Sequence, residues 1–286
     1  MDVLEELVRL RRSGERCALA TIVEVNGSIP SFESAKMLVR ADGTIVGTIG
    51  GGCVEAEVWS AAREVMETGK PRRLRFSLGQ DAAYDEGLIC GGQLEVFIEP
   101  VEPQNRALIF GAGHISKSLA QLTSLLGFHT SVIDNRESFA NRERFPEADS
   151  VVAGEYEEVF PSLEVNSSSY IIIVTRGHRD DMRVLRWAVT TPARYIALIG
   201  SKRKVFNVVK ELEKEGVPRS SFDRVYGPMG LNIGALTPEE IAVSVAAEIV
   251  AVRRNAASNW RALSMSVFAH SGTNPNTNDD TKALLS

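Results

Sequence analysis

The residues best placed for chemistry form a glycine turn, Gly111-Ala112-Gly113, directly after a short apolar run at residues 107–110. Glycines let a backbone come close to an anion, and the start of the following helix offers N–H groups and a partial positive charge. His114 follows the turn, and Asp134 lies about 20 residues further on, where an acid commonly accepts from a ribose diol. We predict that the backbone of residues 111–114 binds a phosphate-bearing ligand.

The residues around this turn leave the nature of the ligand open. Ser116 replaces the third glycine of a G-x-G-x-x-G motif, so the match to a dinucleotide-binding sequence is incomplete. Asp134 repels a 2′-phosphate and favours NAD over NADP, whereas Arg136 would reverse this preference. A domain that keeps the turn but binds no nucleotide is the alternative.

Two further polar loops are expected at the same edge of the sheet. They are Thr175-Arg176-Gly177-His178 and Gly200-Ser201-Lys202-Arg203. The second suits a phosphate or another anion, with a solvated basic helix start as the alternative. His114 and His178 follow strand ends, where a histidine can orient a ligand or transfer a proton, although a structural role stays open for both. Asp180 and Asp181 are most simply caps of the next helix.

Two cysteines adjoin glycine clusters, in Gly50-Gly51-Gly52-Cys53 and in Cys90-Gly91-Gly92. Cys53 falls at a predicted helix start, where the helix dipole favours a thiolate, and a thiolate is a soft ligand for a metal or for sulfur. The alternative is that both are small buried side chains. The sequence has no zinc-type cluster of Cys and His, so a metal bound by protein ligands alone is not expected.

The elements that position these residues fall into two domains and a tail. Residues 105–254 alternate strands and helices, which predicts a Rossmann-like, doubly wound parallel sheet, with the fold as a whole in the α/β class. Residues 1–100 mix strands and helices without that alternation and form a small α+β domain. Residues 99–103 read as a stiff linker, and residues 255–286 as a mobile polar tail.

Composition narrows the class of protein. The chain of 286 residues carries a net charge of −5, which argues against a nucleic-acid or membrane-surface binder. No apolar run approaches the ~20 residues of a membrane span, and the charged N-terminal helix is not a signal peptide. Three cysteines do not make a disulfide framework, so a cytoplasmic location is expected.

Several stretches together resemble the xanthine dehydrogenase accessory protein family (XdhC/CoxI), nearly along the whole chain to residue 254. The resemblance is carried by G-S-I-P at 27–30, G-T-I-G-G-G-C-V-E at 47–55, C-G-G at 90–92, F-G-A-G-H at 110–114, T-R-G-H-x-x-D at 175–181, I-G-S-K-R-K at 199–204 and G-L-x-I-G-A-x-T-P-E-E-I-A at 230–242. The last is the most specific. Ser31 and Ser34 depart from the family, which usually has Arg and Gly there, and Asn232 stands where Asp is common.

The resemblance implies an accessory factor, a cofactor-binding chaperone more than a catalyst. It would bind the molybdopterin form of the molybdenum cofactor, protect it during sulfuration with a cysteine desulfurase, and deliver it to a molybdenum hydroxylase such as xanthine dehydrogenase. Cys90, and after it Cys53, would contact the molybdenum or its sulfur, and Gly51, Gly52 and Gly91 would make room for the cofactor. The oligomeric state is open, with a homodimer as one expectation.

Two other functions stay open on the residues alone. One is an NAD(P)-dependent oxidoreductase with His114 or His178 as the proton donor, although the sequence shows no Tyr-x-x-x-Lys pair. The other is a nucleotide-sensing module that binds NAD or another adenine nucleotide and performs no chemistry.

Overall fold

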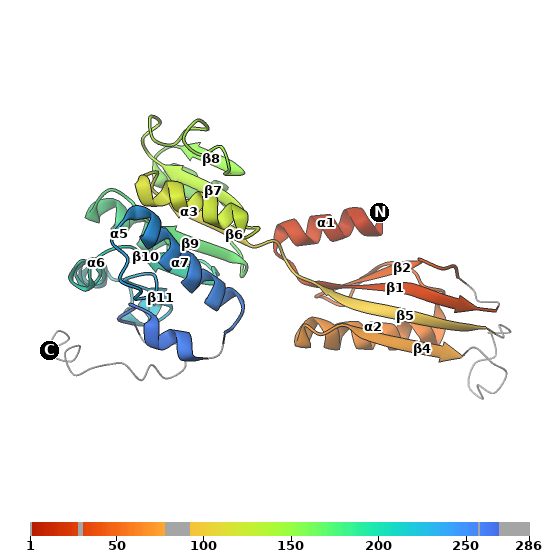
Figure 1. The fold of residues 1–286 in the computed structure, drawn as a ribbon. Coiled ribbons are helices and arrows are strands. Elements are labelled where there is room, and N and C mark those ends of the chain that lie inside the picture. Colours follow the sequence, from red (N-terminus) through yellow and green to blue (C-terminus); the bar gives the residue numbers. More distant parts are fainter. Residues whose placement is uncertain (1, 28–30, 78–91, 257, 269–286) are drawn as a thin grey trace. The chain divides into compact units, whose positions relative to one another are not determined.

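The computed structural model describes residues 2–27, 31–77, 92–256 and 258–268. Its internal contacts divide the chain into two compact units, Met1–Gln104 and Asn105–Ser286 (Figure 1). Among the described residues no helix is both long and apolar enough to cross a membrane.

The first unit is built on an antiparallel sheet with the strand order β3-β2-β1-β5-β4. One face carries a helix, α2, and the other carries α1 at one end of the sheet (Figure 1). The elements are α1 (Val3–Ser13), β1 (Cys17–Asn26), β2 (Lys36–Arg40), β3 (Ile45–Gly47), α2 (Gly52–Thr68), β4 (Arg72–Ser77) and β5 (Gln93–Val101).

The alternation along β1 explains these two layers. Ala18, Ala20 and Ile22 point to the α2 side, while Cys17 and Leu19 point to the α1 side, because successive side chains of a strand face opposite ways. β2 and β3 pair antiparallel across Asp42-Gly43, a dipeptide that favours a tight hairpin turn. The sheet is therefore buried on both faces near its centre, which an α+β unit of this size requires.

The end of the first unit corrects the prediction of a linker at residues 99–103. β5 continues to Val101 and pairs with β1 as far as Cys17, so residues 99–101 are strand and not a linker. Pro100 is tolerated at this position of the ladder although it has no N–H to donate. The described part of β5 begins at Gln93, after the Cys90-Gly91-Gly92 cluster, and residues 88–91 lie outside the described part of the chain.

The second unit contains six parallel strands in the order β11-β10-β9-β6-β7-β8. This is the doubly wound order, with two halves that run outward from neighbouring central strands β6 and β9. The strands are β6 (Arg106–Phe110), β7 (His129–Asp134), β8 (Ser150–Ala153), β9 (Ser169–Ile173), β10 (Tyr195–Leu198) and β11 (Val225–Tyr226). The predicted α/β class and Rossmann-like sheet are thereby confirmed.

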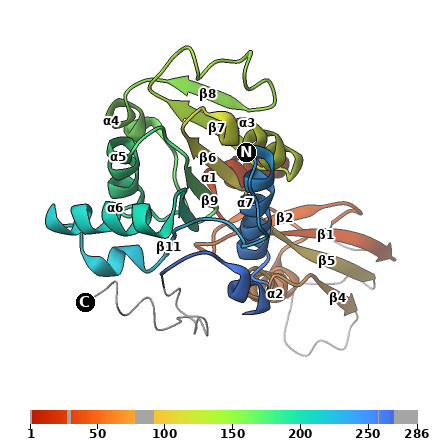
Figure 2. The ribbon, with the colours of Figure 1, turned by 60° about the vertical axis from the view of Figure 1, so that its left-hand side comes forward.

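Helices cover both faces of this sheet, as Figure 2 shows. One face is covered by α3 and α7, and the other by α4, α5 and α6. The helices are α3 (His114–Leu125), α4 (Tyr156–Val159), α5 (His178–Ala188), α6 (Lys202–Lys214) and α7 (Pro238–Arg253), with 3-10 turns η1 (Phe160–Ser162), η2 (Arg219–Phe222) and η3 (Ser258–Leu263). In a doubly wound sheet, the topological switch point is the place where the strand order reverses and ligands commonly bind. Because α3 and α5 lie on opposite faces, this point falls between β6 and β9.

Local signals set the ends of these helices. Thr237 and Glu240 make a capping box at the start of α7. Gly127, with a φ of 78°, ends α3 in the left-handed conformation expected of a glycine after a helix.

The segment after α7 departs from the prediction of a mobile tail beginning at residue 255. Phe268 is buried in the core on the α5 and α6 side of the sheet, and Val267 N donates to Gly227 O at 2.9 Å. An aromatic side chain and backbone pairing therefore hold part of this polar stretch, which composition alone does not show. Residues 269–286 lie outside the described residues.

Candidate functional site

Four loops of the second unit meet at the carboxyl edge of the parallel sheet. In the order of the strands, they follow β10, β9, β6 and β7, at residues 199–201, 174–177, 111–113 and 135–136. Crevices at this edge, beside the switch point, are where open α/β sheets bind ligands. The predicted residues of the second unit all lie in these loops, at the end of β7 or at the first positions of the helices that follow.

The glycine turn is shaped by a close approach of two backbones. Gly111 has a φ of 110°, and a Cβ there would lie 2.3 Å from Val174 O in the loop after β9. A Cβ on Gly113 would meet no atom within 4 Å. The two glycines therefore have different roles, since Gly111 is required by packing and Gly113 leaves the start of α3 uncovered.

The backbone N–H groups of residues 111–114 are not equivalent either. Gly111 N donates to Ile133 O at 2.7 Å, and Ala112 N donates to Asp134 Oδ2 at 2.7 Å. Only Gly113 and His114 stand at the start of α3, where N–H groups have no partner within the helix and no side chain caps them. The part of the turn that suits an anion is thus limited to residues 113–114.

The carboxylate of Asp134 already accepts hydrogen bonds from other residues of this chain. Its carboxylate accepts from Ala112 N, from Arg136 N at 2.9 Å, and from Arg136 Nε and Nη2 at 2.8 and 2.7 Å. The residue is only 1% exposed. Burial opposes its ionisation, but these hydrogen bonds outweigh burial and lower its pKa below the ordinary value. In this arrangement Asp134 holds the turn, and the predicted contact with a ribose diol stays a prediction.

The start of α5 mirrors the start of α3. Gly177 is the N-cap residue and no side chain caps the helix, so its first N–H groups face the same edge of the sheet. His178 and His114 are the first residues of the two helices and both are exposed, as is Arg176. His178 therefore belongs to the helix and not to the loop in which the sequence placed it.

A buried ion pair fixes the loop after β9. Asp181 Oδ1 accepts from Thr175 Oγ1 at 2.7 Å, and Asp181 Oδ2 lies 2.6 Å from Lys204 Nζ in α6. Asp181 is fully buried, and burial raises its pKa in spite of these partners. It was expected to cap α5, but it lies inside the first turn and ties α5 to α6. Asp180 instead pairs with Arg183.

In the basic loop after β10, the serine and the basic residues have different roles. Ser201 Oγ caps α6 by accepting from Lys204 N at 3.2 Å, while Lys202 is exposed at the first helical position. Ser201 is therefore used in the helix cap, and Lys202 and Arg203 are the cations that this segment presents to solvent.

Two arginines and an aromatic ring, Arg136, Arg144 and Phe139, lie beside the glycine turn, and the sequence singled out only Arg136. The guanidinium of Arg136 lies 4.0 Å from the ring centroid of Phe139, and that of Arg144 lies 5.1 Å from the same centroid. Arg144 Nη2 also approaches Ala112 O at 3.4 Å. Arg136 stood out because it follows Asp134, but the sequence carries no pattern that brings Arg144 back to residue 112.

In the first unit, the glycine cluster is occupied by a neighbouring carboxylate. Glu55 in the first turn of α2 accepts from Thr48 Oγ1 and, at 3.1 Å, from Ile49 N, while Gly50 N donates to Thr48 Oγ1 at 3.2 Å. Gly52 and Cys53 are exposed at the start of α2. Cys90 and Gly91 lie outside the described residues, so the structure does not place the second glycine cluster.

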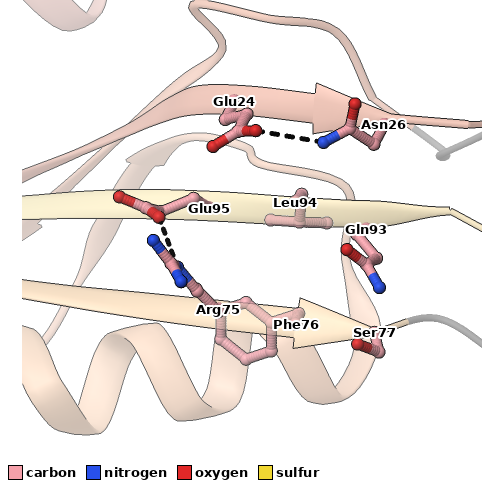
Figure 3. A pocket seen from close by; sticks show the side chains of 8 residues that line it. All are labelled: Glu24, Asn26, Arg75, Phe76, Ser77, Gln93, Leu94 and Glu95. Carbon is pink, nitrogen blue, oxygen red and sulfur yellow. Dashed lines mark hydrogen bonds and ion pairs between the residues drawn. The ribbon is translucent and has the colours of Figure 1, made fainter.

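A separate pocket of about 230 Å³ lies at the ends of β1, β4 and β5 (Figure 3). Glu24 accepts from Asn26 there at 3.1 Å, and Glu95 pairs with Arg75 at 2.6 Å. The remaining lining residues are Phe76, Ser77, Gln93 and Leu94. None of the predicted site residues lines this pocket. In the described part of the chain, no group of three or more His, Cys, Asp or Glu side chains is arranged to hold a metal ion.

Comparison with known families assigns both units. Residues 10–77 match the XdhC and CoxI family, and residues 107–249 match the XdhC Rossmann domain. The chain belongs to the XdhC and CoxI family. This confirms the resemblance carried by the motifs, and it places the β6–α3 turn, the β9–α5 loop and the β10–α6 loop inside the XdhC Rossmann domain.

Three curated proteins are similar to this XdhC-family chain. The protein YqeB of Escherichia coli (strain K12) is 36% identical over 257 residues, which cover 90% of this chain and 47% of YqeB. A probable xanthine dehydrogenase subunit of Bacillus subtilis (strain 168) is 26% identical over 85% of this chain and 95% of its own length. The molybdenum cofactor insertion chaperone PaoD of Escherichia coli (strain K12) is 25% identical over 88% of each. The chain thus spans about half the length of YqeB.

A solved structure supports the fold. The crystal structure of a protein described as a xanthine dehydrogenase from Bacillus halodurans superposes with a TM-score of 0.50 at 24% identity, covering 90% of this chain and 97% of that one. At this identity the likeness concerns the fold alone.

Proposed function

We propose that this chain is an accessory factor that binds the molybdenum cofactor and hands it to a molybdenum hydroxylase. The observation that carries the proposal is the pair of glycine-capped helix starts, at α3 and α5, on either side of the switch point. It is supported by the family match and by the similarity to a molybdenum cofactor insertion chaperone.

The residues at this edge fit the phosphate end of molybdopterin. At Gly113 and Gly177, no described residue other than adjacent chain neighbours lies within 4 Å of the position a Cβ would take, so backbone N–H groups can be approached closely there. Two helix starts supply partial positive charge, and Lys202 and Arg176 add exposed cations. We infer that Gly113, His114, Gly177, His178 and Lys202 hold the phosphate, with Thr175 fixed behind them by Asp181.

The bound cofactor supplies a sulfur-ligated molybdenum, and the chemistry at that metal belongs to the client enzyme. This chain's residues bind and orient the cofactor and protect it while it is sulfurated. The proposal assigns the protein the role of a chaperone more than that of a catalyst.

The thiols belong to the finer part of the proposal. Cys53 is exposed at the start of α2, beside Gly51 and Gly52, and is accessible to a ligand. Cys90 and Gly91 enter on the family-like C-G-G sequence. We propose that Cys90, and after it Cys53, contacts the molybdenum or its sulfur, and that a cysteine desulfurase and a xanthine dehydrogenase type of client are the partners. A cytoplasmic location and a homodimer stay predictions.

The test is the identity of the ligand. The full chain is produced in a host that makes molybdopterin, and the extracted small molecules are identified by mass spectrometry, with calorimetry of the ligand-depleted protein against molybdopterin, NAD+ and AMP. The proposal expects molybdopterin in the extract and a measurable affinity for it. Binding of the adenine nucleotides with no binding of molybdopterin would replace the proposal with a nucleotide-binding role.

A further inference from the structure

We propose that Arg136 and Arg144, arranged around Phe139 at the end of β7, form a subsite for a phosphomonoester group. The inference rests on the proposed function, because it concerns the same crevice of the second unit. It reverses the expectation that Asp134 selects a ribose diol, and it names the arginines as the residues that set ligand preference at this edge.

The carboxylate of Asp134 has little remaining capacity to accept hydrogen bonds from a ribose diol. Its two carboxylate oxygens already accept four hydrogen bonds, from Ala112 N and from three N–H groups of Arg136. A ribose diol needs an acceptor that is exposed, and this carboxylate is almost fully buried. For a ribose diol to bind Asp134, Arg136 would have to give up its hydrogen bonds to this carboxylate. The carboxylate would then be buried without its cationic partner, which costs free energy.

The same contacts prepare Arg136 for an anion. Nε and Nη2 form a two-point contact with Asp134, and the guanidinium lies over the Phe139 ring at 4.0 Å. Its orientation is therefore held on two sides, whereas Nη1 makes no hydrogen bond with any described residue. A guanidinium held in this way can donate to a phosphate oxygen without first losing its partner.

Arg144 adds a charge that Asp134 does not cancel. Asp134 neutralises Arg136, but among the described residues no carboxylate forms an ion pair with Arg144. Arg144 Nε is buried without a hydrogen-bond partner, and Nη2 makes only a long contact of 3.4 Å with Ala112 O. Since Ala112 precedes Gly113, this uncompensated cation lies beside the start of α3 and adds to the positive potential there. The net charge of the group suits an anion.

A phosphomonoester could come from two sources, the 2′-phosphate of NADP or the phosphate of molybdopterin. Calorimetry on the full, ligand-depleted chain separates them with NADP+, NAD+ and molybdopterin as probes. The variants are Arg136→Lys, Arg144→Ala and the control Arg142→Ala. Arg142 lies two residues from Arg144, but its guanidinium already donates to Ala148 O and Asp149 O.

If the source is a dinucleotide, NADP+ binds roughly tenfold or more tightly than NAD+, and Arg144→Ala removes most of that difference. If the source is molybdopterin, its affinity falls roughly tenfold in Arg144→Ala while neither dinucleotide binds. In both cases Arg142→Ala binds like the unaltered chain. Arg136→Lys keeps the charge beside Asp134 and loses the two-point geometry, so it shows an intermediate loss.

The proposal is overturned if NAD+ binds as tightly as NADP+ and molybdopterin affinity is unchanged in both Arg136→Lys and Arg144→Ala. It is also overturned if Arg142→Ala has the same effect as Arg144→Ala, because the effect would then be one of general charge. Arginine-dependent binding of NADP+ without any binding of molybdopterin would retain the subsite and overturn the proposed function.

Discussion

The two glycine-rich helix starts of this chain, at residues 50–52 before α2 and at residues 111–113 before α3, have opposite arrangements of their carboxylates. In the first unit, Glu55 lies in the helix itself and accepts from the loop in front of it. In the second unit, Asp134 lies at the end of the neighbouring strand β7 and accepts a hydrogen bond from Ala112 N. The first arrangement binds the loop before the helix, at residues 48–50, and the second binds the turn at Ala112, while neither helix start has a side-chain cap.

Clustered glycines therefore do not by themselves mark a ligand site. Their N–H groups need an acceptor, and the chain supplies one wherever a carboxylate is within reach. A site remains only where that carboxylate binds a different part of the turn. The glycines at 50–52 then serve to let the chain bend onto Glu55, with positive φ values of 123°, 79° and 63°.

The largest expected effect comes from Gly111→Ala. The added methyl would lie 2.3 Å from Val174 O at a φ of 110°, so backbone must shift or strain must be accepted. We expect the free energy of unfolding of the second unit to fall by about 3 kcal/mol or more. The measurement is urea denaturation of the full chain, with Gly113→Ala as the control, which should cost about 1 kcal/mol or less. Equal costs for the two variants would contradict the distinction between these glycines.

The next effect is expected from Glu55→Ala. Removal of the carboxylate leaves Thr48 Oγ1 and Ile49 N without their acceptor, at a cost of about 1–3 kcal/mol for the first unit. Burial opposes the ionisation of Glu55, but these hydrogen bonds outweigh burial and lower its pKa. Its contribution is therefore present above the ordinary value of 4.5 and is lost as the pH falls below it. Unfolding measured between pH 7 and pH 3 tests this.

The control for Glu55 is Glu57→Ala, on the same helix and exposed. It should change neither the stability nor its pH dependence. If Glu55→Ala is destabilised equally at both ends of the pH range, the carboxylate is not the acceptor of the loop.

A smaller effect on stability, but a clear one on binding, is expected from Gly113→Leu. A side chain there projects into space that no protein atom occupies, across the start of α3. Molybdopterin affinity measured by calorimetry should fall roughly tenfold or more, because the backbone donors are covered, while thermal melting changes little. Gly177→Leu provides the matched variant at the start of α5. If neither variant weakens binding, the two helix starts do not hold the phosphate.

The smallest effect on folding is expected from the cysteine variants. Burial raises the pKa of Cys17 to about 11, so this thiol is protonated at neutral pH and Cys17→Ala serves as the control. We expect Cys90→Ala, and to a lesser degree Cys53→Ala, to retain less molybdopterin and to activate a client less. Cofactor is quantified per mole of folded protein after purification. Retention equal to that of Cys17→Ala in both variants would make these thiols packing residues.

Much of the fold follows from local patterns. Short apolar runs predict the parallel strands to within one or two residues, and the capping box of Thr237 and Glu240 sets the start of α7. Composition was a weaker guide where a few residues decide packing. Phe268 and the backbone of Val267 hold a segment that reads as a polar tail, and Val101 extends a strand into a segment that reads as a linker.

The candidate site shows the same division. The spacing of Gly111, Gly113 and Asp134 was enough to predict the glycine turn, its strand and its helix, because those elements are contiguous in the chain. Which donor meets which acceptor was not predictable, because these contacts depend on strand order. Asp181 reaches Lys204 only because β9 pairs with β10, and Arg144 reaches Ala112 only because β7 pairs with β6.

The sequence by itself therefore determined the two units, the parallel sheet and the set of loops at its edge, since periodicity and turn chemistry act over a few residues. Only the three-dimensional structure decided that Asp134 supports the turn, that Glu55 binds the loop before α2, and that Arg136 and Arg144 converge on Phe139. The physical reason is that hydrogen bonds and ion pairs form over about 3–4 Å. The partner of Asp134 at Ala112 lies 22 residues away in the chain and is brought near by the pairing of β6 with β7, which no local pattern records.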